Sequence, residues 1–322
     1  MMPPTEAAPH GSVSVPPGRV PAPAGALVAV SVARDRRRVL TDLIGLTKPR
    51  VVVMVLVTTA VGYYVGLPAI DVAVWAGMVH LLVGTLLAAG GTLALNQYLE
   101  RDVDALMTRT RVRPLPDGRL QPLEALLFGS AITGLGLVYT AALVSVPAAL
   151  VTAATTALYL FVYTPLKLRT PFCTILGAIP GALPPVTGWV AARGDLGLGG
   201  VVLFGILFLW QLPHTLAIAR LHQDDYARAG VQVLPVVDGQ GASTERQIVT
   251  GSLALLAVGL LPTLIGLAGS LYFVGALALG LVLLTFGMLQ ALAPSTAAAR
   301  RVMFASLLYL PALLALLAFD RP

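Results

Sequence analysis

Nine apolar segments of bilayer-crossing length constrain this 322-residue chain more than any other feature. A helix needs about 20 predominantly apolar residues to cross the hydrocarbon core of a bilayer. Segments of that kind lie at residues 51–67, 73–95, 122–143, 147–164, 173–192, 198–217, 247–268, 270–292 and 302–319. The composition, 57% hydrophobic and only 11% charged, is not that of a soluble globular core. We therefore predict an all-α polytopic membrane protein with nine transmembrane helices.

The first 40 residues differ in composition from the rest of the chain. They are rich in Pro, Ala and Gly and end in the basic run RDRRR at residues 34–38, which is typical of a disordered segment. The arginines follow a short apolar run instead of preceding a long one, which argues against a signal peptide. We expect a disordered cytoplasmic tail at residues 1–40 and one transmembrane domain at residues 41–322.

The positions of Lys and Arg predict the orientation, because basic loops stay on the cytoplasmic side. With the amino terminus inside, only Arg193 and Arg321 of the 21 basic residues lie outside. The same orientation places the long polar loops in the cytoplasm and the carboxyl terminus outside. Topology thus explains the net charge of +6, so we expect a lipid bilayer and no nucleic acid as partner. We predict a multi-pass protein of the cell's plasma (inner) membrane.

The most polar stretch, residues 96–119, holds four of the 15 acidic and five of the 21 basic residues. If the preceding helix continues for two more turns, Asn96, Glu100 and Asp104 share one face, since they lie four residues apart. Such a face suits Mg²⁺, which takes one or two carboxylates and shares its other positions with water and substrate phosphates. The alternative is a cytoplasmic loop whose charges only fix the topology.

The arginines of this stretch suit a diphosphate, because guanidinium groups form forked hydrogen bonds to phosphate oxygens. They are Arg109, Arg111, Arg113 and Arg119. Tyr163 and Lys167 lie four residues apart near the end of the fourth segment, although Pro165 between them makes a regular helix doubtful. Lys167 is either a further cation for the same ligand or a positive-inside anchor.

A second polar stretch, from His214 to Gly230, follows the sixth segment. Each long polar loop thus follows the second span of a four-span group. This predicts two four-helix repeats plus one helix around a central cavity, with the two loops facing each other. His214 is either a hydrogen-bonded interfacial residue or a ligand, and Asp225 is either part of a solvated turn or a functional acid.

Seven motifs in this order resemble one family. They are LTKPR (46–50), NQYLERDVDALMTRT (96–110), RPLPDGR (113–119), YTPLK (163–167), GALPPVTGW (181–189), WQLPHTLAIA (210–219) and LPVV (234–237). Together they resemble the haem branch of the UbiA-type intramembrane prenyltransferases, the protoheme IX farnesyltransferase or haem O synthase family. The resemblance covers residues 41–240 in order, and the later segments match in hydropathy only.

The resemblance implies transfer of a farnesyl group from farnesyl diphosphate to a vinyl group of haem B, which gives haem O for terminal oxidases. It implies Mg²⁺ as cofactor and a haem A synthase as a candidate partner. It also implies roles for individual residues: Asn96, Glu100, Asp104 and Asp225 as catalytic metal-diphosphate residues, Arg109, Arg113, Tyr163 and Lys167 as diphosphate-binding residues, and His214 as a haem contact.

Three positions depart from the family pattern. Leu168 stands where Arg is expected, Cys173 where Asn is expected, and Gln232 where Met or Pro is usual. They bear on the choice of acceptor, so a UbiA-type enzyme that prenylates a quinone precursor or a chlorophyllide-like ring is the nearest alternative. A transporter would carry its polar groups at mid-membrane, and a structural or assembly protein would not need the face of Asn96, Glu100 and Asp104.

Overall fold

A computed structural model describes residues 36–69, 72–239 and 241–322. The predicted disordered tail falls mainly on residues outside these ranges. Its last residues, 36–40, belong to the first helix, α1 (Arg36–Leu46). Val39 and Leu43 of this helix pack against the buried cluster around Leu46 and Leu120. These apolar contacts stabilise the helix over residues that the sequence assigned to the tail.

Every regular element of the described residues is helical. The elements after α1 are α2 (Pro49–Gly66), α3 (Val72–Leu106), α4 (Pro122–Leu143), α5 (Val146–Ala157), the π-helix η1 (Leu158–Tyr163), α6 (Thr164–Leu166), α7 (Cys173–Arg193), α8 (Gly197–Leu221), α9 (Gln223–Arg228), α10 (Leu234–Val237), α11 (Ala242–Gly259), α12 (Leu261–Leu264), α13 (Ser270–Leu292) and α14 (Thr296–Phe319).

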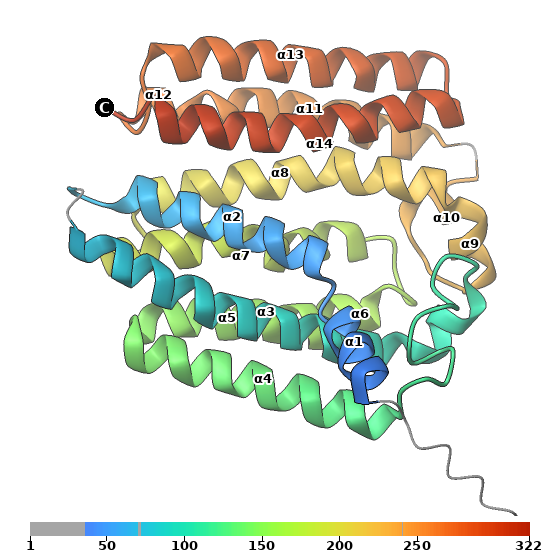
Figure 1. Cartoon of the computed structure of the whole chain (residues 1–322). Helices are drawn as coiled ribbons and strands as arrows, with labels where there is room; N and C mark the ends of the chain where they lie inside the picture. The colour runs from blue at the N-terminus through green and yellow to red at the C-terminus, as the bar shows by residue number, and fades with distance from the viewer. Residues whose placement is uncertain (1–35, 70–71, 240) are drawn as a thin grey trace, which may run out of the picture. The chain divides into compact units, whose positions relative to one another are not determined.

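Within the described ranges, nine helices are long and apolar enough to cross a membrane, which confirms the predicted number. Figure 1 shows them running side by side, with α9, α10 and the α3–α4 loop gathered at one end of the bundle. Two spans begin more than a helical turn earlier than predicted, at Ala242 and Thr296 instead of residues 247 and 302. The reason is that both helices start with a polar turn that hydropathy alone assigns to a loop. The relation between the two predicted repeats stays a prediction.

Helix α3 is the element that positions the site. Its 35 residues span about 50 Å at 1.5 Å per residue, well beyond a hydrocarbon core of about 30 Å. The helix therefore carries its last turns, including Asn96 and Asp104, toward the end of the bundle where the loops lie (Figure 1). Our prediction ended this span at residue 95 because the polar face begins there.

The proline-rich helix α7 packs closely against α2, as the Gly and Pro pattern predicts. It stays helical from Cys173 to Arg193 despite Pro180, Pro184 and Pro185. A Cβ atom at Gly188 would collide with the carbonyl oxygen of Thr59, and one at Gly62 with the backbone of Pro185. Small residues at such crossings let transmembrane helices approach backbone to backbone.

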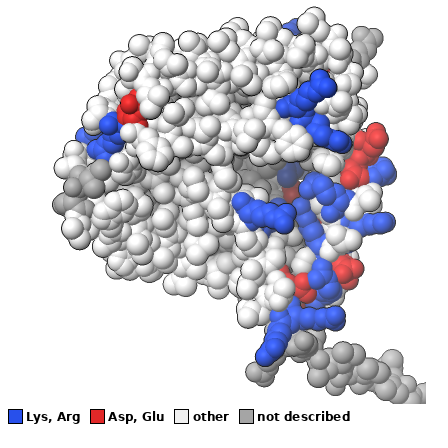
Figure 2. Space-filling view, turned by 45° about the horizontal axis from the view of Figure 1, so that its top comes forward, with Lys and Arg blue, Asp and Glu red and all other residues white. Residues whose placement is uncertain are grey.

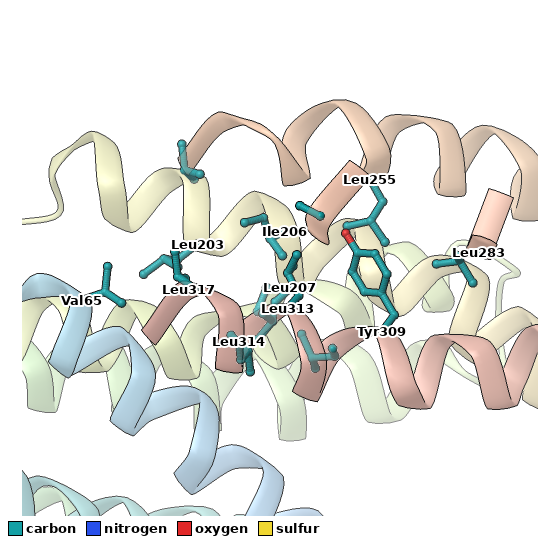
Figure 3. Packing of buried hydrophobic residues seen from close by; sticks show 14 of the residues in the cluster. Val65, Leu203, Ile206, Leu207, Leu255, Leu283, Tyr309, Leu313, Leu314 and Leu317 are labelled. Carbon is teal, nitrogen blue, oxygen red and sulfur yellow. The ribbon is translucent and has the colours of Figure 1, made fainter. Parts of the chain in front are cut away.

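The largest buried cluster joins α7, α8, α11, α13 and α14. Figure 3 shows Ile206, Leu255, Leu283, Tyr309 and Leu313 pointing into it from four of these helices. Lipid tails are as apolar as leucine, so close packing and hydrogen bonds, not transfer from water, stabilise such a core. The cluster holds α8 against α14.

Candidate active site

The polar face predicted on residues 96–104 lines a cavity of about 890 Å³. Asn96, Glu100 and Asp104 all border this cavity, because α3 continues without interruption to Leu106. Asp102 lies off the face, and its side chain is 85% exposed. The prediction that the three side chains share one face is confirmed.

Each of the three side chains is hydrogen-bonded to a basic side chain. Lys48 Nζ donates to Asn96 Oδ1 at 3.1 Å, Lys167 Nζ to Glu100 Oε1 at 2.7 Å, and Arg113 Nη1 to Asp104 Oδ2 at 2.5 Å. Asn96 is completely buried, and its amide also donates to Thr164 Oγ1 at 3.1 Å. Contacts of this kind fix the rotamers of the α3 face before any ligand binds.

Lys48 is a site residue that our assignment of roles missed. It is the only non-glycine residue of the described ranges with a positive φ, at 48°, and it directly precedes Pro49 at the start of α2. A left-handed residue costs about 1–2 kcal/mol, and such strain concentrates at functional sites. Burial, followed by repulsion from Arg113 and Lys167, lowers the pKa of Lys48 to about 7. In the sequence, the place of Lys48 in the LTKPR motif (46–50) was the signal that could have identified it as a site residue.

A π-helix shapes the opposite wall of the cavity. Pro165 has no N–H, and the Thr164 N–H bonds the Tyr159 carbonyl, one residue further back than in an α-helix. In this register Tyr159 and Phe161 line the cavity, whereas Tyr163 does not. Its ring lies under the Lys167 ammonium, with Nζ 4.4 Å from the ring centroid.

Lys167 stays charged in this setting. Burial by itself would lower the pKa of Lys167, but Tyr163 and the carboxylate of Glu100 raise it well above its usual value. A permanently charged ammonium at a cavity wall attracts anions. Tyr163, assigned to the diphosphate clamp, contacts the Lys167 ammonium with its ring in this structure.

Positive charge dominates the cavity wall. The lining includes five basic and two acidic side chains, an excess of three positive charges: Lys48, Arg50, Arg109, Arg113 and Lys167 against Glu100 and Asp104. Figure 2 shows most of the charged side chains of this face gathered at one end, beside a hollow, with a smaller charged group at the other end. Arg111 and Arg119 are not among the lining residues, and Arg119 pairs with Asp42 of α1 and with Asp117 instead.

The two long polar loops meet, as the sequence predicts. The Thr108 N–H donates to Asp225 Oδ1 at 3.3 Å, and Arg228 bonds both Asp225 and Thr108. Asp225 is not among the cavity-lining residues, although its neighbour Tyr226 is. Desolvation by itself would raise the pKa of the Asp225 carboxyl. Hydrogen bonds from Thr108 nevertheless hold this pKa below its usual value. Asp225 thus joins the two loops in this structure.

His214 lies apart from the cavity-lining residues, on the face of α8 that meets α14. Its ring stacks on Trp210 with centroids 4.6 Å apart, and Nδ1 lies 2.8 Å from Ser306 Oγ. The sequence-predicted residues therefore form one cavity group, one loop-joining residue and one separate histidine.

Comparison with known proteins bears directly on this arrangement. The model of the UbiA prenyltransferase family matches residues 55–308, most of the chain. The chain belongs to the UbiA prenyltransferase family. It is 48% identical over 292 residues to a protoheme IX farnesyltransferase of Solibacter usitatus (strain Ellin6076), covering 88% of this chain and 99% of the relative. It is 41% identical over 294 residues to one of Koribacter versatilis (strain Ellin345), covering 88% and 94%.

Solved structures of UbiA proteins share the fold. A digeranylgeranylglyceryl phosphate synthase has a TM-score of 0.72 at 17% identity, covering 87% of this chain and 98% of its own. A UbiA homologue of Archaeoglobus fulgidus bound to GPP and Mg²⁺ has a TM-score of 0.60 at 18% identity, covering 86% and 99%. These similarities confirm the predicted fold class and the predicted family.

The donors on the α3 face of this UbiA protein fit a magnesium ion. Among the described residues, no group of three or more His, Cys, Asp and Glu side chains is placed to hold a metal. Asn96, Glu100 and Asp104 instead offer one amide and two carboxylate groups beside a cavity of about 890 Å³. Mg²⁺ prefers such partial sites, in which water and phosphate oxygens complete the octahedron.

Proposed function

We propose that this chain transfers the farnesyl group of farnesyl diphosphate to a vinyl carbon of haem B, which gives haem O. The observation that carries the proposal is the cavity in which the polar face of α3 meets five basic side chains. Its relatives named protoheme IX farnesyltransferase, 48% and 41% identical over most of the chain, support the choice of donor and acceptor.

The charge of the cavity matches a prenyl diphosphate. A terminal phosphate carries a charge of about −2 near neutral pH, and the inner phosphate adds one more. The cavity offers three excess positive charges when Lys48, whose pKa lies at about 7, is protonated. Arg109 and Arg113 would form forked hydrogen bonds to phosphate oxygens, and Lys48 and Lys167 would act as point charges. Asn96, Glu100 and Asp104 would hold Mg²⁺, which neutralises charge on the diphosphate when bound.

The residues of the cavity wall would assist the break of the allylic C–O bond. The electron pair of that bond leaves with the diphosphate oxygen, where charge develops in the transition state, and preorganised cations stabilise that charge. The vinyl π electrons then bond to the farnesyl carbon. Water adds to the resulting cation beside the porphyrin ring and releases a proton. Apolar lining residues such as Leu99, Val103 and Phe161 would keep other water away until then.

Other assignments belong to the same proposal. Asp225 would complete the diphosphate site from the second loop, and His214 would contact the haem. We propose the cell's plasma (inner) membrane as location, with the amino terminus and the cavity mouth cytoplasmic and the carboxyl terminus outside. We further propose a tail at residues 1–40, a catalytic domain at residues 41–322, and a haem A synthase as recipient of the product.

The test is haem O formation by the purified protein in lipid, with haem B, farnesyl diphosphate and Mg²⁺, followed by mass spectrometry of the haem. A matched pair of variants, Asp104→Asn and Asp102→Asn, removes one carboxylate from the cavity face or from the exposed face of the same helix. Asp104→Asn should lower turnover at least about 100-fold, as loss of a transition-state contact does. Asp102→Asn should leave turnover unchanged.

Three outcomes separate the alternatives. Haem O that a chelator abolishes supports the proposal. Release of diphosphate without a haem product would keep the prenyl transfer and overturn the acceptor, with quinone-type rings as the next candidates. Equal activity of the two Asp variants would remove Asp104 from the site.

A further inference from the structure

Helices α8 and α14 meet through a hydrogen-bonded group of three residues: His214, Trp210 and Ser306. Ser306 is fully buried. His214 Nδ1 lies 2.8 Å from Ser306 Oγ, and Trp210 Nε1 donates to the Ser306 carbonyl at 2.7 Å. Ser306 Oγ also lies 2.7 Å from the carbonyl oxygen of Met303.

Counting protons in this group fixes the state of the histidine. A carbonyl oxygen only accepts, so the single hydroxyl proton of Ser306 must point to Met303. Ser306 Oγ then has only lone pairs to offer to His214, and Nδ1 must carry the proton. In a neutral imidazole one nitrogen donates and the other accepts, so Nε2 of His214 is unprotonated.

The accepting nitrogen is both oriented and available. The indole of Trp210 stacks on the imidazole at an interplanar angle of 15°, which fixes the plane of the ring. Within the described residues, only Nδ1 of this ring has a hydrogen-bond partner, and His214 as a residue is part-exposed. A polar nitrogen inside a transmembrane span without a protein partner is costly, and such residues tend to be functional.

We propose that Ser306 is a positioning residue that holds His214 in the Nδ1–H tautomer, so that Nε2 donates its lone pair to the iron of the porphyrin acceptor. This inference rests on the proposed function, since it needs haem as the substrate. Metal-binding histidines commonly donate their second N–H to an oxygen acceptor, which fixes the tautomer and raises the basicity of the ligating nitrogen. Ser306 and the ring of His214 have that relationship.

A purely structural role makes a different prediction. If the group only packs α8 against α14, porphyrin binding does not depend on the presence of iron. The test therefore compares haem B with iron-free protoporphyrin IX as titrants of the full-length protein in lipid, followed by the visible absorption band and by the dissociation constant.

We expect Ser306→Ala to weaken haem binding about 10- to 100-fold, the usual effect of removing an outer-shell partner of a metal ligand. His214→Ala should weaken it at least as much and change the absorption spectrum, because the iron loses a nitrogen ligand. Neither variant should change the affinity for protoporphyrin IX. Ser306→Thr keeps the hydroxyl and should restore haem binding.

The matched control is His80→Ala, which removes another part-buried membrane histidine with a hydroxyl partner. His80 Nδ1 lies 2.8 Å from the Tyr139 hydroxyl, between α3 and α4. This variant should bind haem as the parent does. Unchanged haem binding and spectrum in His214→Ala would overturn the proposal, as would equal weakening of haem and protoporphyrin binding.

A second measurement reads the tautomer of His214 in the parent protein and uses His214→Ala only to assign the signal. The chain has four histidines, so nitrogen NMR of histidine-labelled protein without haem can assign His214 by comparison with His214→Ala. We expect the Nδ1–H tautomer, and a dominant Nε2–H tautomer would contradict the inference. Both measurements are made without farnesyl diphosphate, so failed haem O formation overturns the proposed function, whereas an absent iron effect with intact turnover overturns only this inference.

Discussion

Replacing Lys48 by methionine should lower activity and raise stability at the same time. The side chain is buried against the cavity, and its pKa lies at about 7 against an ordinary value of 10.5. Because the folded pKa is depressed, the folded protein binds the proton more weakly than the unfolded chain. The protonated Lys48 side chain therefore destabilises the folded protein. This destabilisation is fully present below pH 7 and is lost as the pH rises toward 10.5.

The size of this change in the free energy of unfolding follows from the lowered pKa of Lys48. A difference of 3.5 pKa units at about 1.36 kcal/mol each gives on the order of 5 kcal/mol below pH 7. Asn96 Oδ1 loses its 3.1 Å hydrogen bond from Lys48 in the variant, which costs about 1–3 kcal/mol. The net gain is therefore about 2 kcal/mol or more. Methionine has a similar length and meets the same backbone strain at φ 48°.

The activity should change in the opposite direction. A hydrogen bond to a charged group contributes about 1.5–3 kcal/mol, so the loss of the Lys48 contact should reduce kcat/KM for farnesyl diphosphate about 10- to 100-fold. The assay combines thermal unfolding at pH 6.5 and pH 9 with haem O formation. We expect a higher Tm than the parent at pH 6.5 and a smaller difference at pH 9.

Arg111→Met is the matched control for Lys48→Met, because Arg111 is exposed and does not line the cavity. It should change neither the Tm by more than a degree or two nor kcat/KM by more than about twofold. A Lys48→Met protein that is less stable than the parent at pH 6.5, or fully active, would refute the reasoning.

Three further predictions concern packing and the remaining site residues. Gly188→Ala should lower stability by about 1–3 kcal/mol, since its Cβ meets the Thr59 carbonyl. In the control Gly134→Ala the Cβ meets nothing within 4 Å, so the Tm should rise slightly. Equal Tm values of the two variants would contradict the α2–α7 packing. Tyr163→Phe should keep most of the activity because the ring under Lys167 remains, whereas Tyr163→Ala should reduce activity about tenfold. A severe loss of activity in Tyr163→Phe would show that the hydroxyl contacts the substrate instead. Asp225→Asn should raise both KM for farnesyl diphosphate and the Mg²⁺ concentration needed for activity, because we propose that Asp225 completes the metal-diphosphate site. An unchanged Mg²⁺ requirement would show that Asp225 only joins the two loops.

The sequence predicted the parts of this protein that depend on local periodicity. Hydropathy gave the nine spans, and the four-residue spacing of Asn96, Glu100 and Asp104 placed them on one face, because α3 stays regular through that stretch. Hydropathy ended the second span at residue 95 and began the last-but-two and last spans at residues 247 and 302, whereas the structure has spans at Val74–Leu106, Ala242–Leu264 and Thr296–Phe319. Hydropathy measures the fit to lipid, and a helix can continue into the polar interface without it.

The repeat pattern predicted that the two polar loops meet, but it could not predict which side chains of distant segments bond to each other. Lys48 reaches Asn96 across 48 residues of chain, Lys167 reaches Glu100 across 67, and His214 reaches Ser306 across 92. These pairs depend on how helices pack, which neither spacing nor composition encodes. Tyr163 was assigned to the diphosphate, but the π-helical register turns its ring under Lys167 and leaves Tyr159 on the cavity.

The measurement that tests the central claim most directly is a reaction of the purified protein with haem B, farnesyl diphosphate and Mg²⁺ in water enriched in heavy oxygen, read by mass spectrometry. The account predicts a haem that has gained one farnesyl group and one heavy oxygen atom, since the allylic C–O bond breaks and water completes the product. A haem that gains the farnesyl group with unlabelled oxygen would contradict the proposed addition of water to the cation beside the porphyrin ring. Recovery of unmodified haem B together with intact farnesyl diphosphate would contradict the proposed activity.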